Sequence, residues 1–266
     1  MTGPRKKDDS DWASLLGTLR KLESVSTDEV ARLVRKHTSV TPRHALRRLK
    51  SEGVLTRAET PRRGLYVVTV NHDSNFVSEP IEAVKALCGA ETVFGYGTAL
   101  FMHGLSRYGM LSECYVLTQS RRNRERVGGM VVRFVRTPVE EEIGVISLRY
   151  GRTKVRVTDT ERTLIDCIHR PKYAQGWENV LHALERAQGV KGSRIIEYVK
   201  EYATPSLVAK VGWIAEQHAR KWKVRNTDIE SLFPYLPRTP VKFARGEHGV
   251  LNRRWMLYAP EGRTNG

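Results

Sequence analysis

The sequence predicts an α+β protein, with an N-terminal winged helix-turn-helix followed by a larger mixed α/β domain. Two observations carry this prediction. Residues 26–70 contain two short amphipathic helices followed by a hairpin, and residues 114–222 contain strand-like runs first and amphipathic helices later. The 266 residues are enough for two domains that each bury a core.

Residues 41–53 (TPRHALRRLKSEG) have the pattern of a short amphipathic helix. Thr41 is suited to the N-cap and Pro42 to the first helical position, and Gly53 can end the helix because glycine accepts a left-handed backbone. Successive residues of a helix are about 100° apart, so this helix has two distinct faces. One face is apolar and carries Ala45, Leu46 and Leu49. The opposite face is polar and basic and carries Arg43, His44, Arg47, Arg48 and Ser51. The basic face fits the major groove of DNA.

The residues on both sides of this helix complete the pattern. Residues 27–36 form a second amphipathic helix that is capped at Ser26 or Thr27. The short linker that follows can set the two helices at a steep angle, as in a helix-turn-helix. Residues 54–57 and 64–70 then predict a hairpin with the sequence TPRRG at its tip, which would be the wing.

The charge of this region favours DNA as its partner. From Arg32 to Arg63 there are ten Lys or Arg residues against two acids, and the whole chain has a net charge of +16 and a pI near 10.0. Such a surplus attracts polyanions, and salt weakens the attraction. A basic helix on the surface of an unrelated protein is the alternative, but the neighbouring elements favour a DNA-binding winged helix-turn-helix over residues 10–72.

Cysteine content and hydrophobic patterning predict a soluble cytoplasmic protein without a membrane partner. Cys88, Cys114 and Cys167 are widely separated, which is not typical of a disulfide framework or a zinc ribbon. No apolar run approaches the about 18 residues that span a bilayer. The first residues (MTGPRKKDDSDW) lack the apolar segment of a secretory signal.

The remaining elements follow in order along the chain. Residues 1–9 are expected to be a disordered leader, and residues 11–22 the first helix, with Trp12 in its core. The pattern loosens at residues 72–78, so the larger domain is placed at 79–266. Its expected helices are 81–88, a short buried helix within 92–106, 158–170, 176–187, 193–202 and 206–222, and its expected strands are 114–118, 130–135, 145–149, 154–157 and a closing pair at 241–246 and 252–260.

Two details of this larger domain can be stated as expectations. Thr158 is expected to cap its helix, with Glu161 at the capping-box position and Pro171 as the stop. His103 is expected to be a satisfied core or boundary histidine and not a ligand.

Motifs of common enzymes do not occur in this sequence. No Glu has Lys two positions later, as a metal-dependent nuclease of the common core type requires. Gly192-Ser193-Arg194 resembles the opening of a nucleotidyltransferase motif, but the paired carboxylates are missing because position 199 is Val. There is no H-E-x-x-H, G-x-S-x-G or Walker loop. We expect no catalytic residues, no metal and no cofactor.

Several packing motifs of the larger domain resemble the AbiEi family, the antitoxins of type IV toxin–antitoxin (abortive infection) systems. They are GTALFMHGLS, TDTERTLIDCIHRP with GWENVLHAL behind it, SLVAKVGWIAEQ and RRWMLYAP. The resemblance implies a winged-helix domain joined to a mixed α/β antitoxin domain. It also implies a repressor of its own operon that binds inverted repeats in the promoter. The implied partner is a nucleotidyltransferase toxin, which the family counters in general without forming a stable complex.

Roles for individual residues follow from their places on the expected elements. Arg43 and Arg47 are candidates for guanine contacts, and His44 and Ser51 for adaptable contacts to bases or phosphates. Thr41, at the start of the helix, is a further candidate DNA-binding residue. Arg48 and Lys50 lie at the edges of the face and are assigned to phosphates, and Arg62 and Arg63 at the wing tip to the backbone or minor groove. Candidate additional DNA contacts are Arg121, Arg122 and Arg124, in a loop that could equally be a solvated hairpin tip.

The main alternative is a stand-alone winged-helix transcription regulator whose larger domain senses a small molecule. An adjacent nucleotidyltransferase gene would favour the antitoxin, and a metabolic operon would favour the sensor. An enzyme that is guided to DNA by its small domain is a second alternative, and incubation with Mg²⁺ and plasmid, or with nucleotides and RNA, would reveal it.

Overall fold

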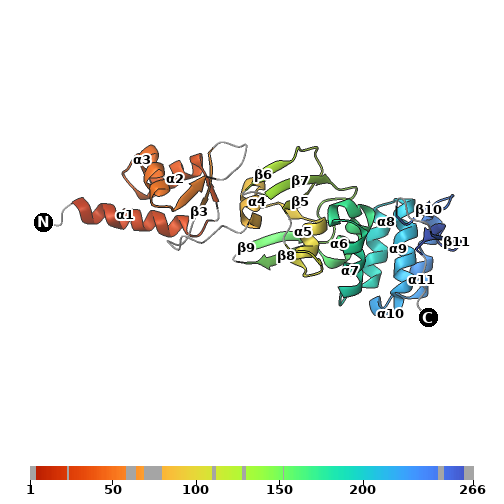
Figure 1. Cartoon of the computed structure of the whole chain (residues 1–266). Coiled ribbons are helices and arrows are strands. Elements are labelled where there is room, and N and C mark those ends of the chain that lie inside the picture. Colours follow the sequence, from red (N-terminus) through yellow and green to blue (C-terminus); the bar gives the residue numbers. More distant parts are fainter. Residues whose placement is uncertain are drawn as a thin grey trace.

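The structure, a computed structural model, describes residues 4–22, 24–57, 64–68, 80–109, 112–127, 130–151, 153–244 and 249–260. Its architecture is α+β, as the sequence predicts (Figure 1). The N-terminal elements are α1 (Pro4–Leu19), β1 (Ser24–Ser26), α2 (Thr27–His37), α3 (Pro42–Ser51), β2 (Leu55–Arg57) and β3 (Leu65–Val68).

The order and pairing of the N-terminal elements are compatible with a winged helix-turn-helix. The three strands form an antiparallel sheet in the order β1-β3-β2, and the three helices pack against it (Figure 1). Val34, Ala45 and Leu49 are fully buried in the shared core. Strand β1 is absent from the sequence prediction because three residues are too few to show a periodic pattern.

Helix α1 differs from the prediction at its start. It begins at Pro4 and not at residue 11, so residues 4–9 of the expected disordered leader are helical. Proline is favoured in the first turn of a helix, and the helix can extend from the turns that Trp12 and Leu15 anchor in the core. The leader contains no apolar periodicity, so the sequence gives no signal for this extension.

Helix α2 begins as predicted. The Ser26 hydroxyl accepts the Glu29 N–H at 3.1 Å, and the Glu29 carboxylate accepts the Ser26 N–H at 2.8 Å, which completes a capping box. These hydrogen bonds hold the pKa of Glu29 below its usual value.

The larger unit is built on a six-stranded mixed sheet with the order β6-β7-β5-β4-β9-β8. Strand pairs β5–β7 and β4–β9 are parallel, and the other pairs are antiparallel. The elements are α4 (Pro80–Cys88), β4 (Val93–Phe94), α5 (Tyr96–Met102), β5 (Glu113–Thr118), β6 (Glu125–Val127), β7 (Met130–Arg136), β8 (Val145–Tyr150) and β9 (Thr153–Thr158).

Both faces of this sheet carry apolar side chains. Val116 belongs to a cluster with Ile81 of α4, whereas its neighbour Leu117 belongs to the large cluster of the later helices. Successive strand residues point to opposite faces, so α4 covers one face and the helical half covers the other. Helix α4 also contacts β1 and β3, and it therefore lies between the N-terminal sheet and the large sheet (Figure 1).

The helical half follows the sheet. Its elements are α6 (Thr160–His169), η1 (Pro171–Ala174), α7 (Trp177–Arg186), α8 (Gly192–Glu201), α9 (Pro205–Gln217), α10 (Ala219–Trp222), α11 (Asn226–Glu230), η2 (Phe233–Tyr235), β10 (Val241–Lys242), β11 (Val250–Asn252) and β12 (Leu257–Ala259). None of the helices that the structure describes is long and apolar enough to cross a membrane.

Three predictions for this half are wrong in detail. Asp159, not Thr158, caps α6, because β9 runs through Thr158 and the Asp159 carboxylate accepts the Arg162 N–H at 2.8 Å. The expected helix 206–222 breaks at His218, whose ring packs 4.8 Å from the Trp222 ring as the chain turns to bury Trp222. The closing strand pair is part of a three-stranded sheet, with β12 between β10 and β11.

Candidate nucleic-acid interface

Helix α3 is built from local signals that the sequence contains. The Thr41 hydroxyl accepts the His44 N–H at 3.4 Å, and Pro42 occupies the first helical position. Gly53 follows the helix with φ +69°, a left-handed conformation that residues with a Cβ adopt at a cost. Ala45 and Leu49 are fully buried, so the opposite face is turned toward solvent.

That solvent face presents Arg43, His44 and Arg47. All three side chains are exposed, and none forms a hydrogen bond, ion pair or ring contact with another residue that the structure describes. Two guanidinium groups and an imidazole are therefore free to meet a ligand. They lie on a helix whose opposite side fixes it to the core, which is the presentation that major-groove readout requires.

Arg48 is engaged within the protein. Its Nε lies 2.7 Å from Glu52 Oε1, and its guanidinium carbon lies 4.1 Å from the centre of the Trp12 ring. The Trp12 indole N–H completes the triad by donating to Glu52 Oε2 at 3.3 Å. This Trp12–Arg48–Glu52 triad joins α1 to the end of α3. The sequence predicts a phosphate contact for Arg48, but its charge is already paired within the protein.

Lys50 and Ser51 are exposed but also have internal contacts. The Lys50 ammonium lies 5.7 Å from the centre of the Tyr66 ring, and the Ser51 hydroxyl donates to the Arg48 carbonyl at 2.9 Å. These weak contacts leave both groups near the edge of the solvent face.

The base of the expected wing is fixed to α2. The backbone N–H and the hydroxyl of Thr27 both donate to the Gly64 carbonyl, at 2.7 and 3.1 Å. Arg62 and Arg63 lie outside the described residues.

The arginines of the loop before β6 do not form a single group. Arg121 and Arg124 are exposed, whereas the Arg122 guanidinium lies 3.7 Å from the centre of the Phe134 ring and 3.4 Å from Glu125 Oε1. The Arg122 side chain is therefore held against the sheet, and the other two remain open to solvent.

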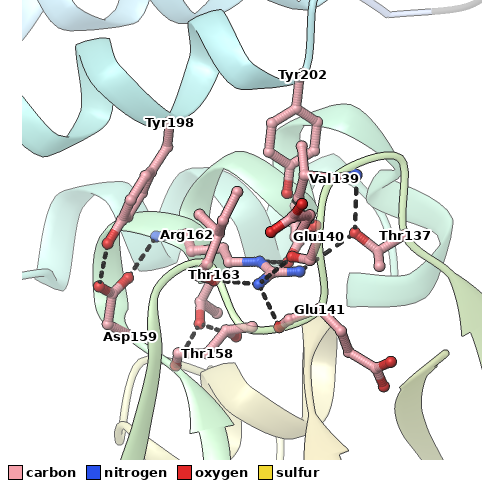
Figure 2. Close-up of polar contacts among 12 residues, drawn as sticks. Thr137, Val139, Glu140, Glu141, Thr158, Asp159, Arg162, Thr163, Tyr198 and Tyr202 are labelled. Atoms are coloured by element: carbon pink, nitrogen blue, oxygen red, sulfur yellow. Dashed lines mark hydrogen bonds and ion pairs between the residues drawn. The ribbon is translucent and has the colours of Figure 1, made fainter. Parts of the chain in front are cut away.

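A buried polar network that the sequence analysis missed surrounds Arg162 on α6 (Figure 2). The Arg162 side chain is fully buried and donates to the carbonyls of Glu140, Glu141 and Ile143, with 2.8 Å to that of Glu141. Its Nε lies 3.7 Å from the equally buried Asp166. Arg162 thus ties the loop between β7 and β8 to α6.

Tyr198 on α8 and Tyr202, directly after the end of α8, also donate hydrogen bonds to acids of this network. The Tyr198 hydroxyl donates to Asp159 at 2.8 Å (Figure 2). The Tyr202 hydroxyl donates to Asp166 at 2.5 Å. Burial raises the pKa of Asp166 to about 6, against the opposing effects of Arg162 and Tyr202. The available signal in the sequence is an Arg–Asp pair four residues apart in a helix that also carries Leu164, Ile165 and Ile168.

Two histidines of the larger unit differ in their partners. His103 Nε2 lies 2.7 Å from the Thr158 carbonyl oxygen, which confirms the expectation of a satisfied histidine. Nδ1 of His169 is buried without a hydrogen-bond partner in the described part of the chain. Burial lowers the pKa of His169 to about 4, and the charges of Arg170 and Lys210 contribute.

This shift predicts a loss of stability in acid. The pKa of His169 is lower in the folded state than the unfolded value near 6.5, so its stabilising effect is present above that value and is lost as the pH falls toward 4. Between pH 7 and pH 4, the free energy of unfolding should therefore fall by about 2 kcal/mol more in the wild-type protein than in His169→Gln, a value that allows for screening by solvent. Urea unfolding at both pH values measures the difference, and equal losses in the two proteins would contradict the assignment.

Comparison with known proteins shows the fold. No model of a protein family matches the chain, and no curated protein matches it. The structure is similar to the crystal structure of the RV2827C protein from Mycobacterium tuberculosis, with a TM-score of 0.63 and 15% sequence identity. The similarity covers 92% of this chain and 90% of that one, so the two proteins share one arrangement of elements over nearly their whole lengths.

Proposed function

We propose that the protein is an antitoxin and transcriptional autorepressor of a type IV toxin–antitoxin operon, related to the AbiEi family. In this proposal α3 enters the major groove at inverted repeats of the operon's promoter. The larger domain counteracts a nucleotidyltransferase toxin in the cytoplasm without forming a stable complex. The observation that carries the DNA-binding part is the exposed face of Arg43, His44 and Arg47, on a helix that Ala45 and Leu49 anchor in the core.

The internal contacts divide the basic residues by role. Arg43 and Arg47 have no partner among the residues that the structure describes, and they can place their planar guanidinium groups against guanine O6 and N7. Arg48 is held by Trp12 and Glu52, so we assign it to positioning α3 and give phosphate contact to Lys50. Arg121 and Arg124 are candidates for further phosphate contacts.

We expect Arg47→Ala to weaken binding to the promoter repeat by about 1–3 kcal/mol while it changes binding to a scrambled duplex much less. Arg63→Ala should instead weaken both duplexes alike, because a backbone contact carries no sequence information. Fluorescence anisotropy at two salt concentrations measures both effects. Arg20→Ala, which removes an exposed arginine from the turn that follows α1, is the matched control. Identical losses on both duplexes for Arg47→Ala and Arg63→Ala would refute the role of Arg47.

The antitoxin part has its own test. Co-expression with a neighbouring nucleotidyltransferase gene should restore growth, and variants of α3 that lose repression should still do so when expressed from a foreign promoter. Failure of the wild-type protein to restore growth would contradict the antitoxin proposal and leave the DNA-binding proposal standing.

A further inference from the structure

Strand β8 lies at one edge of the six-stranded sheet (Figure 1). It pairs with β9 over its whole length, Val145–Tyr150, in a continuous register and without a proline. Among the described residues no other strand pairs with it. The opposite edge of the sheet is formed by β6, which has three residues and contacts α4. A long and regular edge strand offers a row of unpaired backbone groups, and another chain can pair with it.

One hydrogen bond shows which backbone groups of β8 are directed away from β9. The Asp159 N–H donates to the Gly144 carbonyl at 2.7 Å, and the register of the two strands places these residues directly opposite each other. Hydrogen-bonded and non-hydrogen-bonded pairs alternate along an antiparallel ladder. Val145, Ser147 and Arg149 therefore direct their N–H and C=O groups outward. Apart from the Val145 N–H, which donates within the preceding turn, these groups have no hydrogen-bond partner in the described part of the chain.

The side chains along this edge are open to solvent. Ile146 is 38% exposed, although it is a large aliphatic residue. Ser147 and Arg149 are exposed as well, and Arg149 has no ion pair, hydrogen bond or ring contact with another described residue. An apolar side chain and an unpaired cation thus lie beside the outward backbone groups.

The charges along this edge are separated from one another. The turn that leads into β8 carries Glu140, Glu141 and Glu142, whereas the far end of the strand carries Arg149. Glu142 is paired with Arg156, but the side chains of Glu140 and Glu141 form no ion pair with a described residue. A matching strand must present a basic end to this turn and an acidic end to Arg149. A second copy of β8 does so, because a twofold axis reverses its direction.

We propose that two copies of the protein pair through β8, with the strands antiparallel and centred on Ser147. In this register Ser147 faces its own copy and Val145 faces Arg149, so four backbone hydrogen bonds can join the strands. Ile146 lies opposite Leu148 of the second copy, which gives the exposed aliphatic side chain an apolar neighbour. Arg149 lies beside the acidic turn of the second copy. The two sheets then form one continuous sheet.

This dimer goes beyond the proposed DNA binding and does not depend on it. The two proposals are compatible, because a twofold axis also relates the halves of an inverted repeat, and each half could receive one copy of α3.

Sedimentation equilibrium of the full-length protein without DNA, from about 1 to about 200 µM, tests this proposal. We expect a reversible monomer–dimer equilibrium with a dissociation constant of about 1–50 µM, since one pair of strands buries a small area. Ser147→Pro removes an outward N–H and keeps the hydrogen bonds to β9, so dimerisation should be at least about tenfold weaker. Ser147→Ala keeps this N–H and should dimerise like the wild type.

An exchange of charges tests the orientation of the strands. Arg149→Glu places an acid beside the acidic turn of the second copy and should weaken dimerisation at least about tenfold. Glu140→Arg/Glu141→Arg/Arg149→Glu exchanges the charges of the two ends and should recover most of this loss. Arg121→Glu makes the same change of charge in an exposed loop and should leave the dissociation constant unchanged.

A wild-type protein that is monomeric at about 200 µM would overturn the proposal. So would a dimer that neither Ser147→Pro nor Arg149→Glu weakens, or a loss that the exchange of charges does not recover. Thermal unfolding shows whether each variant is folded, and the charge variants serve if Ser147→Pro is not. Arg47→Ala should dimerise normally, so failure of the DNA-binding proposal and failure of this one can be told apart.

Discussion

Replacement of Arg162 by Met is expected to destabilise the larger domain by about 3–5 kcal/mol. The substitution removes a fully buried guanidinium, takes away the cation beside the buried Asp166, and deprives the carbonyls of Glu140, Glu141 and Ile143 of this donor. Four of the five tryptophans lie in the larger domain, so denaturant unfolding followed by tryptophan fluorescence reports chiefly on this domain.

Two further variants make the Arg162 test specific. Arg162→Met/Asp166→Leu removes both charges and should recover part of the loss, because a buried pair replaced together costs less than one broken pair. Arg186→Met removes an exposed arginine from the end of α7 and should stay within about 0.5 kcal/mol of the wild type. A loss below about 1 kcal/mol in Arg162→Met would show that the network does not hold the loop to α6.

Replacement of Trp12 by Ala is expected to cost about 3–5 kcal/mol in the N-terminal domain, enough to unfold a unit of this size in part. Trp12 is 6% exposed, and it carries both the stacking contact with Arg48 and the hydrogen bond to Glu52. The proposed DNA binding should then fall on every sequence, unlike the selective loss that we expect for Arg47→Ala. Hydrogen exchange of peptides from α2 and α3, followed by mass spectrometry, measures the local unfolding.

The Trp12 prediction has an internal control in the same region. Leu22→Ala removes an apolar side chain that is 37% exposed and should leave exchange in α3 nearly unchanged. Trp12→Phe keeps an aromatic ring under Arg48 but removes the donor to Glu52. We expect this variant to lose about 1 kcal/mol of unfolding free energy. Unchanged protection of α3 in Trp12→Ala would show that α1 does not support the helix.

Local signals explain how much of the fold could be predicted. Thr41, Pro42 and Gly53 define α3 through contacts within a few residues, and the Ser26–Glu29 capping box does the same for α2. The longer strands are runs rich in apolar and β-branched residues, and this composition located them within one residue at each end. The two-residue strand β4 and the break at His218 depend on tertiary packing and give no such signal.

The candidate site was predictable only in part, for the same reason. The sequence places Arg43, His44, Arg47 and Arg48 on one helical face. It does not show that the guanidinium of Arg48 stacks on Trp12, which lies 36 positions earlier in the chain. Arg162 appears in the sequence as one more charge, whereas its acceptors lie 19–25 residues earlier in the chain.

The most direct test of the central claim is the ratio of affinities for the operon's own promoter fragment and a scrambled duplex at physiological salt. For the wild-type protein we predict a ratio of roughly a thousandfold or more. For Arg43→Ala/His44→Ala/Arg47→Ala, which keeps the buried face of α3, the ratio should fall toward one while weak binding to both duplexes remains. A wild-type ratio near one, or a triple variant that retains the wild-type ratio, would contradict the claim that this face of α3 reads DNA.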